Sequence, residues 1–250
     1  MEFLSHVTTK LKYYVYIYSH PETNEVFYIG KGKGNRVFSH LKEQSECPKI
    51  EYIEQLKNQG LKPKIEILIH GLEDEEIALK VESSIIDLIG IKNLTNKQSG
   101  YKSATYGRMT VDQINSMYDR QPIDITEPAI LIKVNQSFRF SMTKNELYDY
   151  TRGRWRLNPE RAKNAKYGFA VYQGIIQEVY EIFDWHKAGT TKSCRNESGK
   201  TKLDTEDSLV GRYEFTGKIA SKEIREKFRL KSVEHIFNKK SQNPIMYVNI

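Results

Sequence analysis

The alternation of apolar and polar positions identifies the strands in the first half of the chain. Residues 13–19 are almost all aromatic or β-branched, residues 26–29 repeat that character, and His-Pro-Glu-Thr-Asn lies between them. This combination predicts a β-hairpin. After Pro63, isoleucines occupy every second position at 65, 67 and 69, and this alternation predicts a third strand.

Helical patterns surround this third strand. Residues 49–59 have helical character and stop at Gly60, and the acidic run at 73–76 favours the start of a second helix, which we expect to reach Gly90. Residues 110–118 predict a short third helix.

The second of these helices has a carboxylate near its apolar stripe. An α-helix turns by about 100° per residue, so each side chain has an angle around the helix axis relative to Ile77. Val81, Ile85 and Leu88 lie within about 80° of Ile77 and form an apolar stripe, whereas Glu82 lies at about 140°. We therefore expect Glu82 at the margin of the buried face, where an unpaired charge is costly.

Residues 121–128 contain two prolines and no periodicity, which marks a domain boundary. We predict a first domain at 1–120, a linker at 121–128 and a second domain at 129–250, with a polar loop at 187–208. In the second domain, strands are predicted at 129–134, 167–172, 175–183, 212–219 and 246–250, and helices at 143–150, 159–165 and 221–228. The expected fold class is α+β, with a small three-stranded sheet in the first domain and a mixed β-barrel-like second domain.

The distribution of charge supports two modules. The chain has 39 Lys and Arg against 32 Asp and Glu, and the first 120 residues hold 16 of each kind. Residues 121–250 therefore hold 23 basic and 16 acidic residues, which is the whole net charge of +7. The second module is the better candidate for binding a polyanion such as DNA.

Cysteine content and hydropathy exclude several classes of protein. Cys47 and Cys194 are far apart and belong to no Cys/His cluster, so neither a disulfide framework nor a structural zinc site is predicted. The apolar runs are much shorter than the roughly 18 residues that span a membrane, and the N-terminus lacks the pattern of a signal peptide. We expect a soluble cytoplasmic protein with no membrane partner.

Candidate chemistry gathers after the hairpin. The run GKGKGNR fits neither GxxxxGK[ST] nor GxGxxG, because Asn35 stands at the last glycine position, so a nucleotide-binding loop is disfavoured. Arg36 and His40 are four residues apart and would share one face of an α-helix. With tyrosines on both strands, Glu82 and Asn96, the chain has the groups that phosphodiester cleavage needs: an activated water, a cation for phosphate oxygens and a carboxylate for a divalent metal.

These residues resemble the signature of the GIY-YIG nuclease superfamily over about residues 12–105. In that family two half-motifs on neighbouring strands precede an Arg, a His, a metal-binding Glu and an Asn. The first half-motif here, Val15-Tyr16-Ile17, departs from Gly-Ile-Tyr, and the second is Tyr28-Ile29-Gly30. The resemblance implies a DNA endonuclease that uses Mg²⁺ or Mn²⁺. The implied catalytic residues are Tyr16, Tyr28, Lys31, Arg36, His40 and Asn96, with Glu82 as the metal ligand.

The expected mechanism follows from these assignments. Tyr16 would activate the attacking water, either with Lys31 lowering its pKa or with His40 accepting its proton. Arg36 would offset charge on the phosphate in the transition state.

The second half has a basic and aromatic cluster. Arg152-Gly-Arg154-Trp155-Arg156 suits phosphate contacts combined with base stacking. This cluster and the sequences Tyr-Gly-Phe-Ala-Val-Tyr and Arg-Tyr-Glu-Phe-Thr-Gly resemble the PUA-like group of domains, which includes EVE and YTH modules. That resemblance implies a pocket for a flipped base, with Trp155 and Trp185 as candidate walls and Arg152, Arg154 and Arg156 as further DNA-binding residues.

The favoured function is a restriction endonuclease directed at modified DNA, such as DNA with methylated or hydroxymethylated cytosine, as part of antiphage defence. The alternatives are a structure-selective repair or homing nuclease, and a nucleic-acid-binding module with an inactive nuclease half. The expected partner is DNA, most simply double-stranded. Because each chain would carry one active site, two chains are expected to pair at least transiently on DNA.

Overall fold

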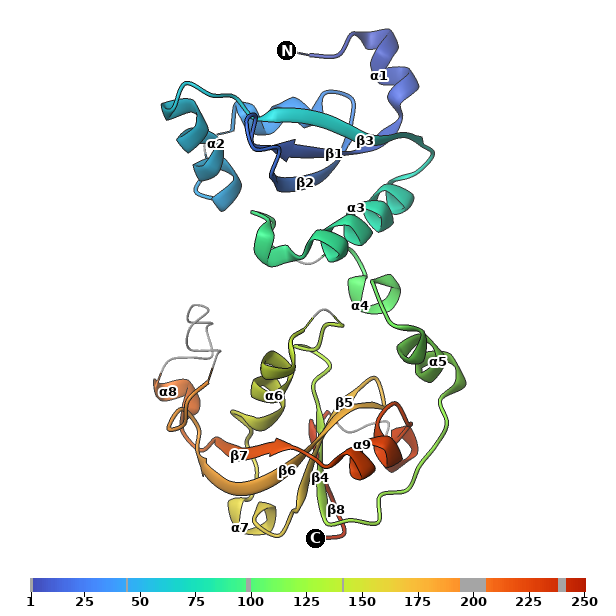
Figure 1. The fold of residues 1–250 in the computed structure, drawn as a ribbon, viewed down its shortest axis with the longest axis vertical. Coiled ribbons are helices and arrows are strands. Elements are labelled where there is room, and N and C mark those ends of the chain that lie inside the picture. The colour runs from blue at the N-terminus through green and yellow to red at the C-terminus, as the bar shows by residue number, and fades with distance from the viewer. Residues whose placement is uncertain (1, 44, 98–99, 141, 194–205, 238–241) are drawn as a thin grey trace. The chain divides into compact units, whose positions relative to one another are not determined.

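The computed structural model describes residues 2–43, 45–97, 100–140, 142–193, 206–237 and 242–250 (Figure 1). The chain forms two compact units, Met1–Arg108 and Met109–Ile250. The first unit ends before residue 120, so the helix α5 (Val111–Asp119) belongs to the second. Cys194 and most of the loop predicted at 187–208 lie outside the described residues.

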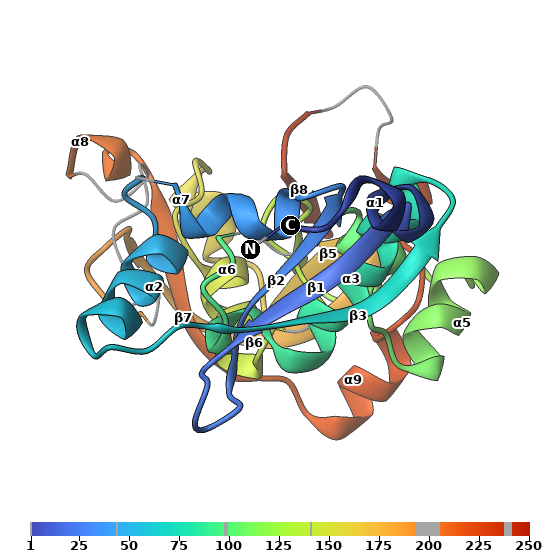
Figure 2. The ribbon, with the colours of Figure 1, turned by 90° about the horizontal axis from the view of Figure 1, so that it is seen from above.

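The first unit contains a three-stranded antiparallel sheet with the strand order β2-β1-β3, which Figure 2 shows from above. The predicted hairpin, third strand and two longer helices are confirmed. The strands are β1 (Tyr13–Ser19), β2 (Val26–Lys33) and β3 (Lys64–Leu72), and the helices are α1 (Ser5–Leu11), η1 (Arg36–Leu41), α2 (Pro48–Asn58), α3 (Glu75–Ile89), η2 (Ile91–Asn93) and α4 (Ser103–Tyr106).

The two faces of β1 build two cores. Tyr14, Tyr16 and Tyr18 point to one face and pack with apolar residues of η1 and α2. Val15 and Ile17 point to the other face and pack with residues of α3. Alternation along one strand therefore fixes which helix covers each side of the sheet.

The glycine and lysine run is part of the second strand, which we expected to end at residue 29. β2 continues to Lys33, with Gly30 opposite Tyr16 and Gly32 opposite Tyr14. A Cβ atom would lie 2.7 Å from the Tyr16 ring at Gly30 and 2.5 Å from the Tyr14 ring at Gly32, which is too close. The glycines make room for two tyrosine rings, and the alternating lysines point to the opposite face.

The buried face of α3 is rotated from the predicted one. Leu88, near the middle of the predicted stripe, is 70% exposed, whereas Ala78, Ser83 and Ile86 are buried. With Ile77 at 0° and about 100° per residue, Ala78, Ser83 and Ile86 lie at about 100°, 240° and 180° around the helix. Glu82, at about 140°, lies within this range, so the buried face is centred near it. Glu82 therefore projects toward the sheet and does not lie at the margin.

The second unit contains a five-stranded sheet with the order β7-β6-β5-β4-β8, in which β4 and β5 are parallel and the other pairs are antiparallel. All five predicted strands and all three predicted helices are present. The strands are β4 (Ala129–Lys133), β5 (Tyr167–Tyr172), β6 (Ile175–Lys187), β7 (Tyr213–Ile219) and β8 (Ile245–Val248), and the helices are α5, α6 (Lys144–Arg152), α7 (Pro159–Ala162), α8 (Glu206–Leu209), α9 (Lys222–Phe228) and η4 (Glu234–Ile236).

Helices cover both faces of this sheet. Phe228 of α9 packs edge-on against Phe169 on one face, and Tyr148 of α6 packs against Tyr180 and Phe215 on the other. In the described residues β7 and β8 are the two edges of an open sheet, so the barrel-like closure that we predicted is not found. None of the described helices has the length and apolar character needed to cross a membrane.

Candidate active site

The outer edge of β2 is covered by side chains from distant parts of the chain. The Asn96 side chain accepts a hydrogen bond from the Ile29 N–H (3.1 Å) and donates one to the Ile29 carbonyl (2.8 Å), as a neighbouring strand would. Glu82 Oε1 accepts a hydrogen bond from the Lys31 N–H (3.0 Å). Because an edge strand leaves such groups unpaired, these contacts satisfy the edge and also fix Glu82 and Asn96 beside it.

An open pocket of about 560 Å³ lies along this edge. Tyr28, Glu82 and Asn96 line it, together with Cys47, Lys49, Thr95, Lys97 and Tyr101. Three of the predicted site residues, from three separate segments, therefore meet in one pocket.

Glu82 has the properties of a cation ligand. Burial raises the pKa of its carboxyl group, and the Lys31 N–H and the charges of Lys31 and Arg36 offset only part of that effect. Its Oε2 atom has no hydrogen-bond partner among the described residues. The described residues contain no cluster of three or more His, Cys, Asp and Glu side chains that could hold a metal, so Glu82 would be the ligand without a second such side chain beside it. A single carboxylate suits Mg²⁺, because this ion keeps several water ligands and often binds one carboxylate and a phosphate.

The segment that carries Arg36 and His40 is a 3₁₀ helix and not the α-helix that we expected. With about three residues per turn, two side chains four residues apart are separated by about 120° and do not share a face. Arg36 is accordingly exposed, whereas His40 is 8% exposed.

Two tyrosines that we did not predict as site residues hold this 3₁₀ helix in place. Tyr14 Oη donates a hydrogen bond to the Gly34 carbonyl (2.8 Å) and accepts one from the Val37 N–H (3.2 Å), and Tyr18 Oη donates to the Val37 carbonyl. The Tyr-x-Tyr-x-Tyr alternation of β1 is the sequence feature that could have identified these two tyrosines. The same alternation is typical of any buried strand, so it does not by itself indicate a site residue.

Arg36 is available for a ligand. No hydrogen bond or ion pair joins its guanidinium to the described residues, and its side chain is exposed. Its charge nevertheless acts on the site, because it lowers the pKa values of Tyr16, Tyr28 and Glu82 against the larger opposing effect of burial.

Tyr28 and Tyr16 occupy different environments. Tyr28 is half-buried and lines the pocket, whereas Tyr16 is 0% exposed and its hydroxyl has no hydrogen-bond partner of good geometry in the described part of the chain. Burial raises the pKa of both phenols. The Lys31 ammonium points to the opposite face of the sheet, where it pairs with Glu75 of α3. The structure therefore gives no support to Tyr16 as the group that activates water with help from Lys31.

His40 lies against Tyr28, with the two rings edge to face and 5.6 Å between their centroids. Its Nδ1 atom is 2.7 Å from Glu43 Oε2 and 2.8 Å from Lys49 Nζ. Burial lowers the pKa of His40, while the contact with Glu43 opposes that shift. We did not predict Glu43 or Lys49, which become recognisable only when the fold brings α2 beside η1.

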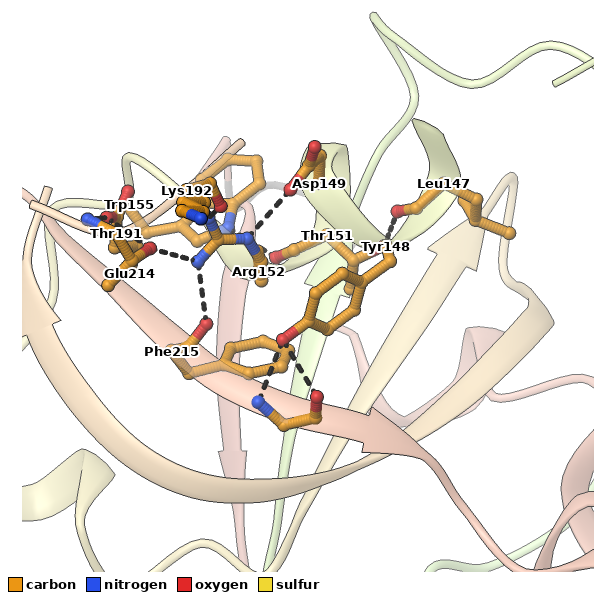
Figure 3. A network of polar contacts seen from close by, with 11 residues as sticks. Leu147, Tyr148, Asp149, Thr151, Arg152, Trp155, Thr191, Lys192, Glu214 and Phe215 are labelled. Carbon is orange, nitrogen blue, oxygen red and sulfur yellow. Dashed lines mark hydrogen bonds and ion pairs between the residues drawn. The ribbon is translucent and has the colours of Figure 1, made fainter. Parts of the chain in front are cut away.

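The basic cluster of the second unit is divided between the interior and the surface. Arg152 is 2% exposed, and its guanidinium bonds to Asp149, Thr191, Lys192 and Phe215 (Figure 3). Its donors are used inside the protein, which argues against the phosphate contact that we expected. Trp185 is buried against Phe215.

The other predicted residues differ in exposure, and Arg154 is also buried, with 8% of its surface exposed, which argues against an open phosphate contact. Arg156 is exposed, and Trp155 is half-buried with its indole N–H bonded to the Thr151 carbonyl. A pocket of about 590 Å³ is lined by Trp155, Arg154, Tyr150, Arg212, Lys133 and Asn135, among others. Trp185 is not among its lining residues, so the structure does not bring the two tryptophans into this pocket.

Comparison with known proteins identifies relatives of the first part of the chain. Residues 22–118 match the family described as the LEM-3-like GIY-YIG domain. The Caenorhabditis elegans protein "Ankyrin repeat and LEM domain-containing protein 1 homolog" is 34% identical over 86 residues, which cover 30% of this chain and 12% of that protein. No solved structure matches the chain.

The family match supports the resemblance to the GIY-YIG superfamily. It includes Tyr28, Arg36, His40, Glu82 and Asn96 and begins after Tyr16. It ends at residue 118, so the resemblance of the second half to the PUA-like group stays a prediction.

Proposed function

We propose that the first unit is a metal-dependent endonuclease domain that hydrolyses phosphodiester bonds in DNA. The observation that carries the proposal is the pocket at the edge of β2, where a partly buried carboxylate with an open oxygen, Glu82, lies with Tyr28 and Asn96. The exposed guanidinium of Arg36 supplies a cation that no residue in the described ranges pairs with.

In this proposal each residue has a separate task. Arg36 binds non-bridging oxygens of the scissile phosphate and offsets the charge that grows as water attacks phosphorus and the bond to the leaving oxygen breaks. Tyr28 presents its hydroxyl to the same phosphate, and Asn96 holds the strand of Tyr28 in place through Ile29. Tyr16 packs behind Tyr28, with ring centroids 6.1 Å apart, and acts as support.

Glu82 is the residue that would hold a divalent metal ion, Mg²⁺ or Mn²⁺. When bound, such an ion supplies a Lewis acid that stabilises the leaving oxygen. Because Glu82 Oε1 accepts a hydrogen bond from the Lys31 N–H, which fixes the orientation of the carboxylate, Oε2 is the oxygen that would hold the ion.

We propose that the second unit selects the DNA, and that the whole chain is a restriction enzyme for modified DNA. Two features of this unit support the proposal: residues 121–250 carry the net positive charge, and a pocket large enough for a base lies between Trp155, Arg154 and Arg212. Arg156 is the exposed cation of the cluster and is assigned to a phosphate.

The test is cleavage of three DNAs by the full chain: unmodified plasmid, hydroxymethylcytosine-containing DNA and branched DNA, each with Mg²⁺, with Mn²⁺ or with EDTA. Metal-dependent cutting of the modified DNA alone is the expected result. Equal cutting of plain and modified DNA would remove the reader from the proposal, and preference for branched DNA would favour a structure-selective nuclease. Binding without cutting in any metal would indicate a nucleic-acid-binding module. Because each chain has one site, dependence of double-strand cuts on protein concentration would indicate paired chains.

Arg36→Ala is expected to slow cleavage by about 10²- to 10³-fold, the cost of removing one preorganised donor to a developing charge. The thermal unfolding temperature should stay unchanged, because the side chain is exposed and unpaired in the described structure. Lys42→Ala is the matched control, since Lys42 directly follows the same 3₁₀ helix and already pairs with Glu2 (3.2 Å). Equal losses in the two variants would show only a general effect of charge.

A further inference from the structure

Two side chains compete for one nitrogen of His40. Nδ1 lies 2.7 Å from Glu43 Oε2 and 2.8 Å from Lys49 Nζ. A lysine ammonium only donates hydrogen bonds and a carboxylate only accepts them, so Lys49 requires a lone pair on Nδ1 and Glu43 requires a proton there. In a neutral imidazole one contact excludes the other, and the choice decides which ring nitrogen carries the proton.

Burial favours the contact with Lys49. The Lys49 side chain is 11% exposed, and the next acceptor among the described residues, Glu43 Oε2, is 3.9 Å from its Nζ atom. Its ammonium also lies 4.7 Å from the centroid of the Tyr28 ring, near the site. If Nδ1 were protonated, this buried ammonium would lose its one acceptor at hydrogen-bonding distance among the described residues, which is costly.

Glu43 can do without Nδ1. Its side chain is 42% exposed, so water can solvate the carboxylate, and Ser45 Oγ already donates a hydrogen bond to Oε1 (3.0 Å).

The position of Lys49 in α2 supports a specific role. It is the second residue of this helix, after Pro48, at the end where the helix dipole disfavours a cation. A lysine at such a position would ordinarily extend into water. Here it turns inward to His40 and Tyr28.

We infer that Lys49 is a positioning residue of the candidate active site, which holds His40 as a neutral imidazole with its ring proton on Nε2. His40 then meets the substrate phosphate as a hydrogen-bond donor and does not accept a proton. Glu43 is the competing partner, which would place the proton on Nδ1. The role in cleavage rests on the proposed nuclease function, whereas the state of the imidazole can be measured without it.

The charged and titratable neighbours of His40 among the described residues all bear on this state. Burial lowers the pKa of His40, and the charges of Lys49 and Arg36 lower it further, whereas Glu43 raises it. Tyr28, whose ring lies edge to face with the imidazole, is a phenol whose pKa is itself raised by burial, so it stays neutral near pH 7. Removing Lys49 and removing Glu43 should therefore shift the pKa of His40 in opposite directions.

The direct test is ¹⁵N NMR of the His40 imidazole in the full chain as a function of pH, for the wild type, Lys49→Met and Glu43→Gln. In the wild type we expect the proton on Nε2 at neutral pH. In Lys49→Met the proton should move to Nδ1, now bonded to Glu43, and the pKa of His40 should rise. In Glu43→Gln the proton should stay on Nε2 and the pKa should fall. Lys62→Met, which removes an exposed lysine, should match the wild type.

Cleavage assays provide the second measurement. Lys49→Met is expected to slow cleavage at neutral pH by about ten- to a hundred-fold, as when the hydrogen-bonded partner of a site residue is removed. The acid limb of its pH profile should move to higher pH, and that of Glu43→Gln to lower pH. A wild-type imidazole protonated on Nδ1, or one unchanged by Lys49→Met, would overturn the inference. A correct NMR result without any cleavage would instead contradict the proposed nuclease function, and Glu43→Gln keeps the test decisive if Lys49→Met fails to fold.

Discussion

Replacing Glu82 by glutamine is expected to reduce metal-dependent DNA cleavage by at least about a thousand-fold, equivalent to several kcal/mol of transition-state stabilisation. The amide oxygen of glutamine can still accept the hydrogen bond from the Lys31 N–H that Glu82 accepts at 3.0 Å. The substitution therefore removes the negative charge and keeps the local geometry. DNA binding in EDTA, measured by fluorescence anisotropy, should stay within about two-fold of the wild type, because exposed cations supply the phosphate contacts.

The same variant should be at least as stable as the wild type at neutral pH without metal. Burial raises the pKa of Glu82 in the folded protein above its ordinary value. The stability associated with the neutral carboxyl group is therefore fully present below the ordinary pKa of 4.5 and is lost as the pH rises through the raised value. Glutamine is neutral at every pH, so the advantage of the variant should appear near pH 7 in EDTA and disappear in acid.

Addition of Mg²⁺ separates the effect of charge from the effect of metal. An ion that binds the folded state raises the thermal unfolding temperature in proportion to the logarithm of its concentration. We expect such a rise in the wild type and not in Glu82→Gln. An equal rise in both proteins, or cleavage retained by the variant, would contradict the assignment of Glu82 as the metal ligand.

Local patterns in the sequence predicted the described strands and the helices α2, α3, α5, α6, α7 and α9, because each is determined by residues close together in the chain. They did not predict α1, α4 or α8. The alternation in β1 and β3 is an example. The orientation of α3 was not predictable in this way, since Ile77 and Leu88 are apolar but exposed. The opposite face of α3 is covered in part by the main chain at Gly100, which is distant from Ser83 in the sequence. A Cβ atom at Gly100 would lie 2.2 Å from Ser83 Cα, so the two backbones are in close contact.

The candidate site shows the same division between local and long-range information. The residue types around Tyr28 could be named from the sequence, but their roles depend on which backbone groups they meet. Asn96 bonds to the edge of β2, and Lys31 points away from Tyr16 because strand residues alternate between faces. Lys49 was overlooked because nothing near it in the sequence shows that it will approach His40.

Arg152→Ala is expected to destabilise the second unit by about 3–5 kcal/mol, the usual cost of breaking a buried charge pair on one side. The guanidinium donates to Asp149 Oδ1 (2.8 Å), to Thr191 Oγ1 (2.6 Å) and to the carbonyls of Lys192 (2.5 Å) and Phe215 (3.0 Å) (Figure 3). It thus ties the end of α6 to β7 and to the residues after β6. Loss of the guanidinium leaves two buried acceptors, Asp149 Oδ1 and the Phe215 carbonyl, without this donor. It also removes the cation beside Asp149, which is 6% exposed.

Arg156→Ala is the matched control for Arg152→Ala, because it removes the same group from the surface four residues later. Its stability should lie within about 0.5 kcal/mol of the wild type, while DNA binding weakens and its salt dependence falls by the amount for about one phosphate contact. Arg152→Ala should lower the unfolding temperature by about 10 °C, measured by circular dichroism. The double variant Arg152→Ala/Asp149→Ala should lose less free energy of unfolding than the sum of the losses in the two single variants, because it also removes the carboxylate that Arg152 neutralises. A stable Arg152→Ala protein that binds DNA weakly would instead show that Arg152 leaves the interior to meet phosphate.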